Sequence, residues 1–454
     1  MLSSADLVGI LAMLAATIVQ LALLRHAQVT RNLDPEWVRK LFHVSGGILG
    51  LALPWVFDGI APVLVLGAFM GLLFHLLRVV PALRASFGQV LLGIRRETVG
   101  DYCFVASLAL LFWLARGDKL LYSIPLLVVT LADALAALIG QTYGKLPLQM
   151  RGDRKTIEGA VTFLLIAFLC IHVPVLLWGE TGRVESLLIA ADISLMVMLA
   201  EAAAWWGLDN ILIPILAYMA LKSMLAMDAA ALLTHLGFVL TLIAIVILVR
   251  KHTTLGDDAL AGGVLWGYVI WAVGGWEWLL PVLLQLISYA NVTGRTPRER
   301  RRNLGFPVVL ANIIGSIIWL LLYRETGDLK YFVPFVACYS MNMAVVTLVR
   351  TMYLEPHKPW REALSYSAAT AMLVAIPALL VVYGIGSMTV IGLTAILAAV
   401  TGATMAFRCV QPGLTRYPVD TARQMRQAIV VTSGSCVALG IEMGQVWALQ
   451  SFPS

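Results

Sequence analysis

Long runs of apolar residues, separated by short polar segments, follow one another along the whole chain. A helix crosses a bilayer with roughly 20 mostly apolar residues and satisfies its own backbone hydrogen bonds there. The alternation that is typical of membrane barrels does not recur. The pattern predicts an all-α, polytopic integral membrane protein with about 16 transmembrane helices. The expected spans cover residues 7–24, 43–57, 60–77, 101–115, 121–139, 157–178, 185–205, 211–226, 229–249, 258–273, 276–290, 305–323, 331–349, 364–383, 387–407 and 427–449.

Composition argues against a soluble protein and against a nucleic-acid partner. Of the 454 residues 60% are hydrophobic and 13% are charged, whereas soluble domains carry about 25% charged residues. The net charge of +6 comes from basic residues in short loops, where membrane proteins commonly carry them. The five cysteines form no CxxC pair and are interpreted as small core residues.

Basic residues cluster in alternate loops, which predicts the topology. The loops after the first, third, fifth and ninth expected spans are rich in arginine and lysine. By the positive-inside rule these loops are cytoplasmic and the N-terminus lies outside, in what we expect to be a prokaryotic plasma membrane. A basic segment at Arg250 followed by Asp257 and Asp258 marks a boundary between two expected membrane domains, residues 1–250 and 251–454.

Three basic side chains enter the second expected span. Arg39 and His43 are four residues apart and share one face of a helix, with Lys40 beside them. The two cations could hold phosphate, and His43 could act as an acid, a base or a hydrogen-bond donor. A basic anchor at the membrane interface is the alternative interpretation.

Asp133 is a lone carboxylate in an apolar run, where an ionisable group is costly and by default indicates function. It could bind Mg²⁺ or a substrate hydroxyl group. Gly140 and Gly144, followed by Lys145, could bring backbone N–H groups against phosphate. The same GxxxG spacing also serves close packing of helices.

Further charged residues lie beside the following loops. Lys155 is suited to phosphate, and Glu158 could bind metal or pair with that lysine. Glu201 lies in an alanine-rich run at membrane depth. Asp209 and Asn210 begin the next span, either as a helix cap or as a metal or phosphate site.

Together these groups supply the parts that phosphoryl transfer requires. The reaction needs carboxylates that hold metal, cations on the phosphates and a positioned nucleophile. Arg96, in the loop after the third span, adds a further cation, although an ion pair within that loop also explains it. The groups fall on the expected cytoplasmic side, where soluble nucleotide is available.

The order of the motifs resembles the polyprenol kinase family, which includes phytol kinases and dolichol kinases. The resemblance covers most of residues 30–225 and implies an integral membrane kinase. Such a kinase transfers a phosphoryl group, typically from CTP, to the hydroxyl of an isoprenoid alcohol such as phytol or geranylgeraniol. The motifs are Arg39-Lys40-x-x-His43, Arg95-Arg96-Glu97-Thr98-x-Gly100, Asp133-Ala-x-Ala-Ala-x-x-Gly140-x-x-x-Gly144-Lys145, Lys155-Thr-x-Glu158-Gly159 and Glu201…Gly207-Leu-Asp209-Asn210…Pro214.

The resemblance also implies Mg²⁺ as cofactor and roles for single residues. The candidate catalytic residues are Asp133, His43 and Glu201, and the candidate metal ligands are Asp133, Asp209 and Glu158. The candidate nucleotide- and phosphate-binding residues are Arg39, Lys40, Arg96, Gly140, Gly144, Lys145, Lys155 and Asn210. No GxxxxGK[ST] motif is present, so an ATP site of the soluble type is not expected.

Residues 251–454 resemble the phytyl-phosphate kinase family more weakly, through glycine pairs such as Gly262-Gly263 and through Asn312. Where that family has an Ala-Asp-Thr type of motif, this chain reads Val345-Val346-Thr347. The carboxylate is missing, so we expect this domain to be a non-catalytic remnant or scaffold.

Two other functions remain open from the sequence. A CTP-dependent cytidylyltransferase would act on a lipid phosphate and release pyrophosphate. A transporter of isoprenoids or other lipids would move its substrate without turning over nucleotide. The chain length of the alcohol, the choice of nucleotide and the oligomeric state are not set by the sequence.

Overall fold

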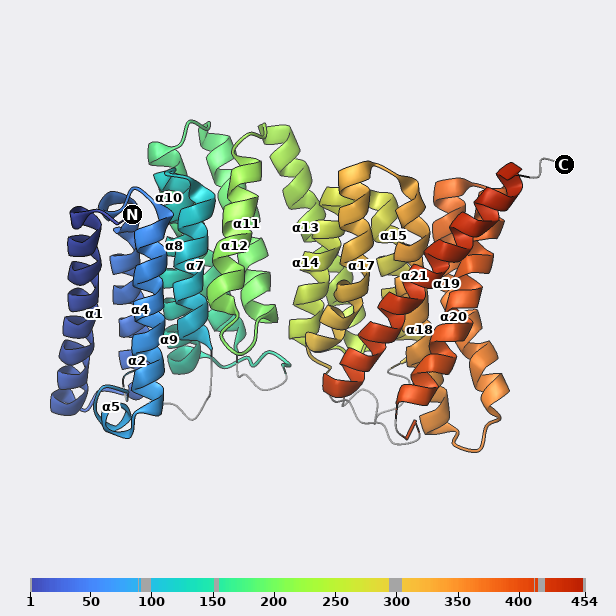
Figure 1. Cartoon of the computed structure of the whole chain (residues 1–454), viewed down its shortest axis with the longest axis horizontal. Helices are drawn as coiled ribbons and strands as arrows, with labels where there is room; N and C mark the ends of the chain where they lie inside the picture. The colour runs from blue at the N-terminus through green and yellow to red at the C-terminus, as the bar shows by residue number, and fades with distance from the viewer. Residues whose placement is uncertain are drawn as a thin grey trace. The chain divides into compact units, whose positions relative to one another are not determined.

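The computed structural model describes residues 2–88, 90, 99–150, 155–293, 304–411, 413–414 and 421–451. Helices make up most of these residues and no β-strand occurs among them, which confirms the expected all-α class. The chain divides into two compact units (Figure 1), Met1–Leu148 with Gly152–Leu240 and Gln149–Arg151 with Thr241–Ser454. The division falls within helix α13 (Ala229–Val249), about ten residues before the boundary that we expected from the sequence.

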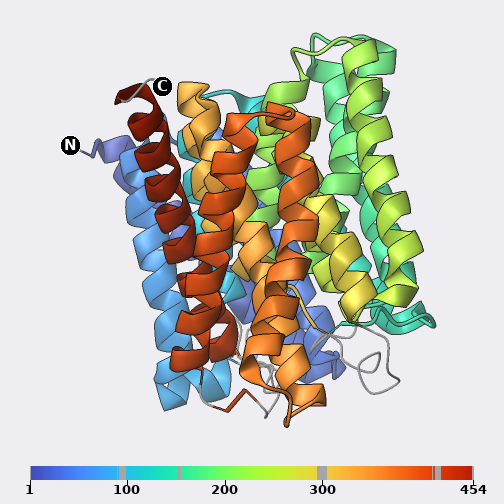
Figure 2. The ribbon, with the colours of Figure 1, turned by 90° about the vertical axis from the view of Figure 1, so that its right-hand side faces the viewer.

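The first unit is a bundle of helices that run side by side in two perpendicular views (Figures 1 and 2). Its elements are α1 (Ser4–Arg31), α2 (Pro35–Leu51), α3 (Leu53–Val56), α4 (Ile60–Val79), α5 (Pro81–Ser86), α7 (Gly100–Ala115), α8 (Lys119–Leu127), the π-helical turn η1 (Val128–Ala132), α9 (Asp133–Tyr143), α10 (Ile157–Trp178), α11 (Arg183–Ala203) and α12 (Asp209–Met224), followed by α13.

Local signals explain where the first two helices begin and end. At the start of α1, Ser3 and Asp6 bond each other's backbone N–H groups in a capping box. The helix ends at Asn32, which has a left-handed backbone (φ 49°). Asp34 then caps α2, because its side chain accepts from the backbone N–H groups of Glu36 and Trp37. Pro35 is the first residue of α2, a position that suits proline because the N–H of a first-turn residue has no partner within the helix.

The second unit packs around α18 (Phe332–Leu354), which is buried along nearly its whole length. A helix that is apolar all round is stable only when others cover it, and several helices of this unit pack against α18. The remaining elements are the end of α13, η2 (Arg250–His252), α14 (Asp257–Gly274), α15 (Trp276–Val292), α17 (Pro307–Thr326), η3 (Leu329–Tyr331), α19 (Trp360–Tyr383), α20 (Ser387–Val410) and α21 (Thr421–Ser451).

Within the described ranges, 11 helices are long and apolar enough to cross a membrane, as in a multi-pass membrane protein. The expected count of about 16 is not supported. Several of the expected spans form shorter helices that are not among these 11: α2 and α15 have 17 residues each, and α7 and α12 have 16 each. A straight crossing needs roughly 20 residues, so the length of an apolar run in the sequence does not by itself set the length of the helix that forms.

Candidate active site

An ion pair between α2 and α9 lies at the centre of the candidate site. Lys40 Nζ is 2.7 Å from Asp133 Oδ2, and both side chains are nearly excluded from solvent, with 4% and 13% exposed. His43, one turn along α2 from Arg39, places its Nε2 3.8 Å from the same carboxylate oxygen. The structure therefore brings together three residues that the sequence separates by up to 93 positions.

A π-helical turn sets the position of Asp133. The turn η1 ends at Ala132, directly before Asp133, and short π-helical segments are frequent at functional sites. His43 Nε2 donates a hydrogen bond to the carbonyl of Val129 in this turn, at 3.0 Å. Gly47 lets α2 approach closely, because a Cβ at this position would collide with the side chain of Thr130.

A second buried ion pair joins the start of α10 to the end of α11. Lys155 Nζ is 2.9 Å from Glu201 Oε1, and it also donates to the Glu201 carbonyl. Burial lowers the pKa of Lys155, but the neighbouring carboxylates, Glu201 first, outweigh it and the pKa is raised. Lys155 therefore carries its positive charge at neutral pH.

Asp209 and Asn210 connect these pairs to a third part of the bundle. The Asp209 carboxylate accepts from the Asn210 N–H at 3.1 Å, and Asn210 Nδ2 donates to the Gly100 carbonyl at the start of α7. Asp209 is close enough to Asp133 for their carboxylates to repel each other, while Lys155 and Lys40 attract Asp209. Charged groups of both signs at these helix ends therefore interact with one another.

Two ion pairs border this cluster. Arg39 makes a two-pronged contact with Glu36, through hydrogen bonds of 3.0 and 2.7 Å, so part of its donor capacity is used within α2. Arg78 binds Asp101 at 2.7 Å and lies over the ring of Tyr102. The Arg78–Asp101 pair was not predicted. The isolated charges at the end of one apolar run and the start of the next were its only sequence signal.

The structure gives Glu158 and the two glycines local roles. Glu158 accepts hydrogen bonds from the backbone N–H groups of Lys145 and Leu146. A Cβ at Gly140 would lie 3.1 Å from Thr156 Oγ1, a tight contact, so glycine eases the close approach of α9 to the segment that begins α10. A Cβ at Gly144 would collide with the same threonine. Phosphate binding by these glycines, and by the exposed Lys145, stays a prediction, and Arg96 lies outside the described residues.

The metal ligands predicted from the sequence are Asp133, Asp209 and Glu158. Among the residues that the structure describes, no group of three or more His, Cys, Asp and Glu side chains is arranged to hold an ion. Mg²⁺, however, is usually held by one or two carboxylates together with substrate phosphates. The carboxylates of Asp133 and Asp209 interact electrostatically, whereas Glu158 is turned toward backbone N–H groups, and a metal held by the two aspartates stays a prediction.

In the second unit, the segment that lacks the expected carboxylate lies inside α18. Val345 is fully buried, and the Thr347 hydroxyl donates to the Met343 carbonyl and bonds to Thr370. The segment thus has a packing role between α18 and α19. Catalysis by the second unit was not expected from the sequence, and that expectation stays a prediction.

The comparisons with known proteins add one relative. The chain is 29% identical over 211 residues to the phytol kinase of Synechocystis sp., a match that covers 44% of this chain and 86% of that protein. No family model and no solved structure matches the chain. The distant, partial similarity supports a relation of this chain to the phytol and polyprenol kinases.

Proposed function

We propose that this protein is a membrane kinase that transfers a phosphoryl group to the hydroxyl of an isoprenoid alcohol such as phytol or geranylgeraniol. One observation carries the proposal: the buried cluster in which Lys40 pairs with Asp133, beside Asp209 and the Lys155–Glu201 pair. Charged groups that are buried in a membrane protein cost free energy and by default indicate function. This set combines the cations and carboxylates that phosphoryl transfer requires. The similarity to a phytol kinase supports the same reaction class.

The residues divide into groups that bind phosphate and groups that orient the reacting hydroxyl. Lys40 and Lys155 would place positive charge against the phosphates of the nucleotide. Asp133 would accept a hydrogen bond from the hydroxyl of the alcohol and then take its proton. The alcohol oxygen would bond to the γ-phosphorus of the nucleotide, and the β–γ bridging oxygen would leave with the nucleoside diphosphate. His43 would hold the turn before Asp133 through its bond to Val129.

CTP and Mg²⁺ belong to the proposal. Asp133 and Asp209 would hold the ion together with the nucleotide, and the ion would neutralise charge that develops on the phosphates. The alcohol would keep its apolar chain in the bilayer and its hydroxyl near the interface, so the enzyme has only to align that hydroxyl. We place the site on the cytoplasmic side of a prokaryotic plasma membrane.

A labelling experiment separates this function from the two alternatives. Purified protein in nanodiscs would receive Mg²⁺, geranylgeraniol or geranylgeranyl phosphate, and CTP labelled at either the α- or the γ-phosphate. A kinase moves only the γ-label into the lipid, and only with the alcohol. Movement of the α-label onto the lipid phosphate would instead identify a cytidylyltransferase. Absence of both transfers from a monodisperse sample, with ATP, GTP and UTP also tried, would contradict the proposal.

A further inference from the structure

The loop between α11 and α12 lies beside the proposed kinase site. Residues 204–208 form this loop, and the chain enters it after Glu201 and leaves it at Asp209. Both of these carboxylates interact with Lys155. From Trp206 to Asp209 the chain can span at most about 11 Å, so the loop and the site are immediate neighbours.

The centre of the loop is a tight turn with an unfavourable residue in it. The Leu208 N–H donates to the Trp205 carbonyl at 3.1 Å, and the two residues between them have positive φ, 57° at Trp206 and 85° at Gly207. Positive φ at both central positions is the pattern of a type I′ turn, which glycine, asparagine and aspartate dominate. Gly207 fits its position, but a bulky side chain in a left-handed backbone is a genuine outlier.

A hydrogen bond from another part of the bundle holds Trp206 in this conformation. Val99, directly before α7, donates its N–H to the Trp206 carbonyl at 3.1 Å. Residues in sparsely populated backbone regions persist only where the surrounding structure fixes them, and they cluster at active sites and ligand clamps. The Trp206 residue is 71% exposed, so packing within the protein does not account for tryptophan at this position.

An exposed tryptophan can also anchor a helix at the surface of a membrane. Trp178, the last residue of α10, is 71% exposed as well, but it belongs to a regular helix and needs no unusual backbone. An anchor of that kind does not explain why Trp206 occupies a strained turn. The strain indicates instead that an aromatic ring is required at this point beside the site.

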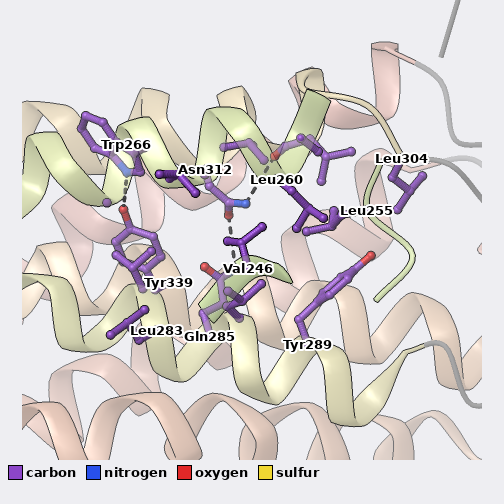
Figure 3. A pocket seen from close by; sticks show the side chains of 18 of the residues that line it. Val246, Leu255, Leu260, Trp266, Leu283, Gln285, Tyr289, Leu304, Asn312 and Tyr339 are labelled. Carbon is purple, nitrogen blue, oxygen red and sulfur yellow. Dashed lines mark hydrogen bonds between the residues drawn. The ribbon is translucent and has the colours of Figure 1, made fainter. Parts of the chain in front are cut away.

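An unpaired acceptor lies four residues after Trp206. Asn210 Nδ2 donates to the Gly100 carbonyl, whereas Asn210 Oδ1 is buried and has no hydrogen-bond partner among the described residues. Buried polar side chains usually pair with each other. In the pocket of the second unit (Figure 3), for example, Trp266 donates to the Tyr339 hydroxyl at 2.8 Å. The unpaired oxygen of Asn210 can therefore accept a hydrogen bond from a ligand.

We propose that residues 204–210 bind the nucleoside part of the phosphoryl donor, with its base stacked on the Trp206 ring and an N–H or O–H group of the nucleoside bonded to Asn210 Oδ1. This inference rests on the proposed function and adds to it the part of the site that recognises the nucleoside. Stacking suits any base, because every base has a π-face. Lys40 and Lys155 would hold the phosphates of the same nucleotide.

Equilibrium binding to the full-length protein in nanodiscs tests the stacking contact. The ligands are labelled CTP and, as its competitor, inorganic triphosphate, which has the phosphates but no nucleoside. Trp206→Asn introduces a residue that favours this turn, so the unfolding midpoint should stay the same or rise. Loss of the ring should weaken CTP binding at least about fivefold and leave the affinity for inorganic triphosphate unchanged. Trp206→Phe should keep most of the affinity for CTP.

Trp178→Asn is the matched control, because it removes an equally exposed ring from the end of α10. Its affinity for CTP should equal that of the wild type. If Trp206→Asn binds CTP as tightly as the wild type, or loses affinity for CTP and inorganic triphosphate equally, the stacking assignment is wrong. If Trp206→Asn and Trp178→Asn weaken CTP binding to the same extent, the two rings act as membrane anchors and the inference is overturned.

The acceptor role of Asn210 has its own test. Asn210→Ala should weaken the binding of CTP about fivefold and leave that of inorganic triphosphate unchanged. An equal loss of affinity for both ligands would show that Asn210 acts on the phosphates or on the fold, and would overturn this role.

Failure of this inference can be distinguished from failure of the proposed function. If the wild type transfers the γ-phosphate of CTP to the alcohol while Trp206→Asn binds CTP normally, only the inference about residues 204–210 is contradicted. If the wild type binds no nucleoside triphosphate, the inference and the proposed function are both contradicted.

Discussion

Lys40 and Asp133 form a 2.7 Å ion pair between α2 and α9, although 93 positions separate them in the sequence. Each charge lies where solvent is nearly excluded, so each depends on the other. The pair therefore serves two ends: it holds α2 against the turn that precedes α9, and it places a cation and a carboxylate together at the proposed site.

Removal of one partner of the pair should strongly destabilise the protein. Lys40→Met or Asp133→Asn alone leaves the other polar group buried without its partner, which costs about 3–5 kcal/mol for a buried charge. The double variant leaves no charge and should lose less than the sum of the single variants. Thermal unfolding in nanodiscs measures this coupling. Additive changes in the midpoint would show that the two side chains do not depend on each other.

His43 should act by position rather than by proton transfer. Its Nε2 donates to the Val129 carbonyl, and a glutamine can place an N–H group near the same point. We expect His43→Gln to retain most of the kinase activity and His43→Leu to lose it. Equal loss in both variants would favour an acid or base role for the imidazole, and the pH profile of the remaining activity would check that role.

Substitutions at Glu158 distinguish a role as an acceptor for backbone N–H groups from a role as a metal ligand. Glu158→Gln keeps a carbonyl oxygen that can accept from the Lys145 and Leu146 N–H groups, whereas Glu158→Ala does not. Glu158→Gln should therefore be as stable as the wild type, and it should reach half-maximal activity at the same Mg²⁺ concentration. A large rise in that concentration for Glu158→Gln alone would assign the residue to the metal.

The Lys155–Glu201 pair predicts how stability depends on pH. The folded-state pKa of Lys155 is raised above the ordinary value of about 10.4. A raised lysine pKa gives stabilisation that is complete below the unfolded-state pKa and is lost as the pH rises through the folded-state pKa. The difference in unfolding midpoint between wild type and Lys155→Met should stay constant from about pH 7 to 9 and shrink only at higher pH. A difference that shrinks near neutral pH would contradict this assignment.

The sequence predicted the helices better than their pairings. The expected span 157–178 coincides with α10, and 229–249 with α13, because long apolar runs bounded by polar residues leave little choice in a membrane. The turn η1 was not predicted, since nothing in an apolar run distinguishes a π-helical turn from an α-helical one. The sequence showed that Lys40 follows Arg39 at the start of a helix. It could not show that the Lys40 side chain contacts Asp133.

Candidate residues were easier to find than their partners. The cost of an ionisable group in an apolar run identified Asp133 and Glu201 without a structure. Which cation each would meet depends on how α2, α9, α10 and α11 pack, and single-sequence spacing carries no such information. For Glu158, spacing could not show that its oxygens accept from the Lys145 and Leu146 N–H groups, and its metal role stays a prediction.

The kinase proposal is tested most directly by measuring how fast the γ-phosphate of CTP is transferred to geranylgeraniol. Three protein samples are compared under the same conditions. Wild type and Asp58→Asn, a substitution in an exposed loop of the first unit, should produce lipid-extractable label at similar rates. Asp133→Asn should reduce the rate at least about 100-fold, because it removes the proposed acceptor of the hydroxyl proton. If Asp133→Asn transfers label at the wild-type rate, the buried cluster around Lys40 and Asp133 is not the kinase site.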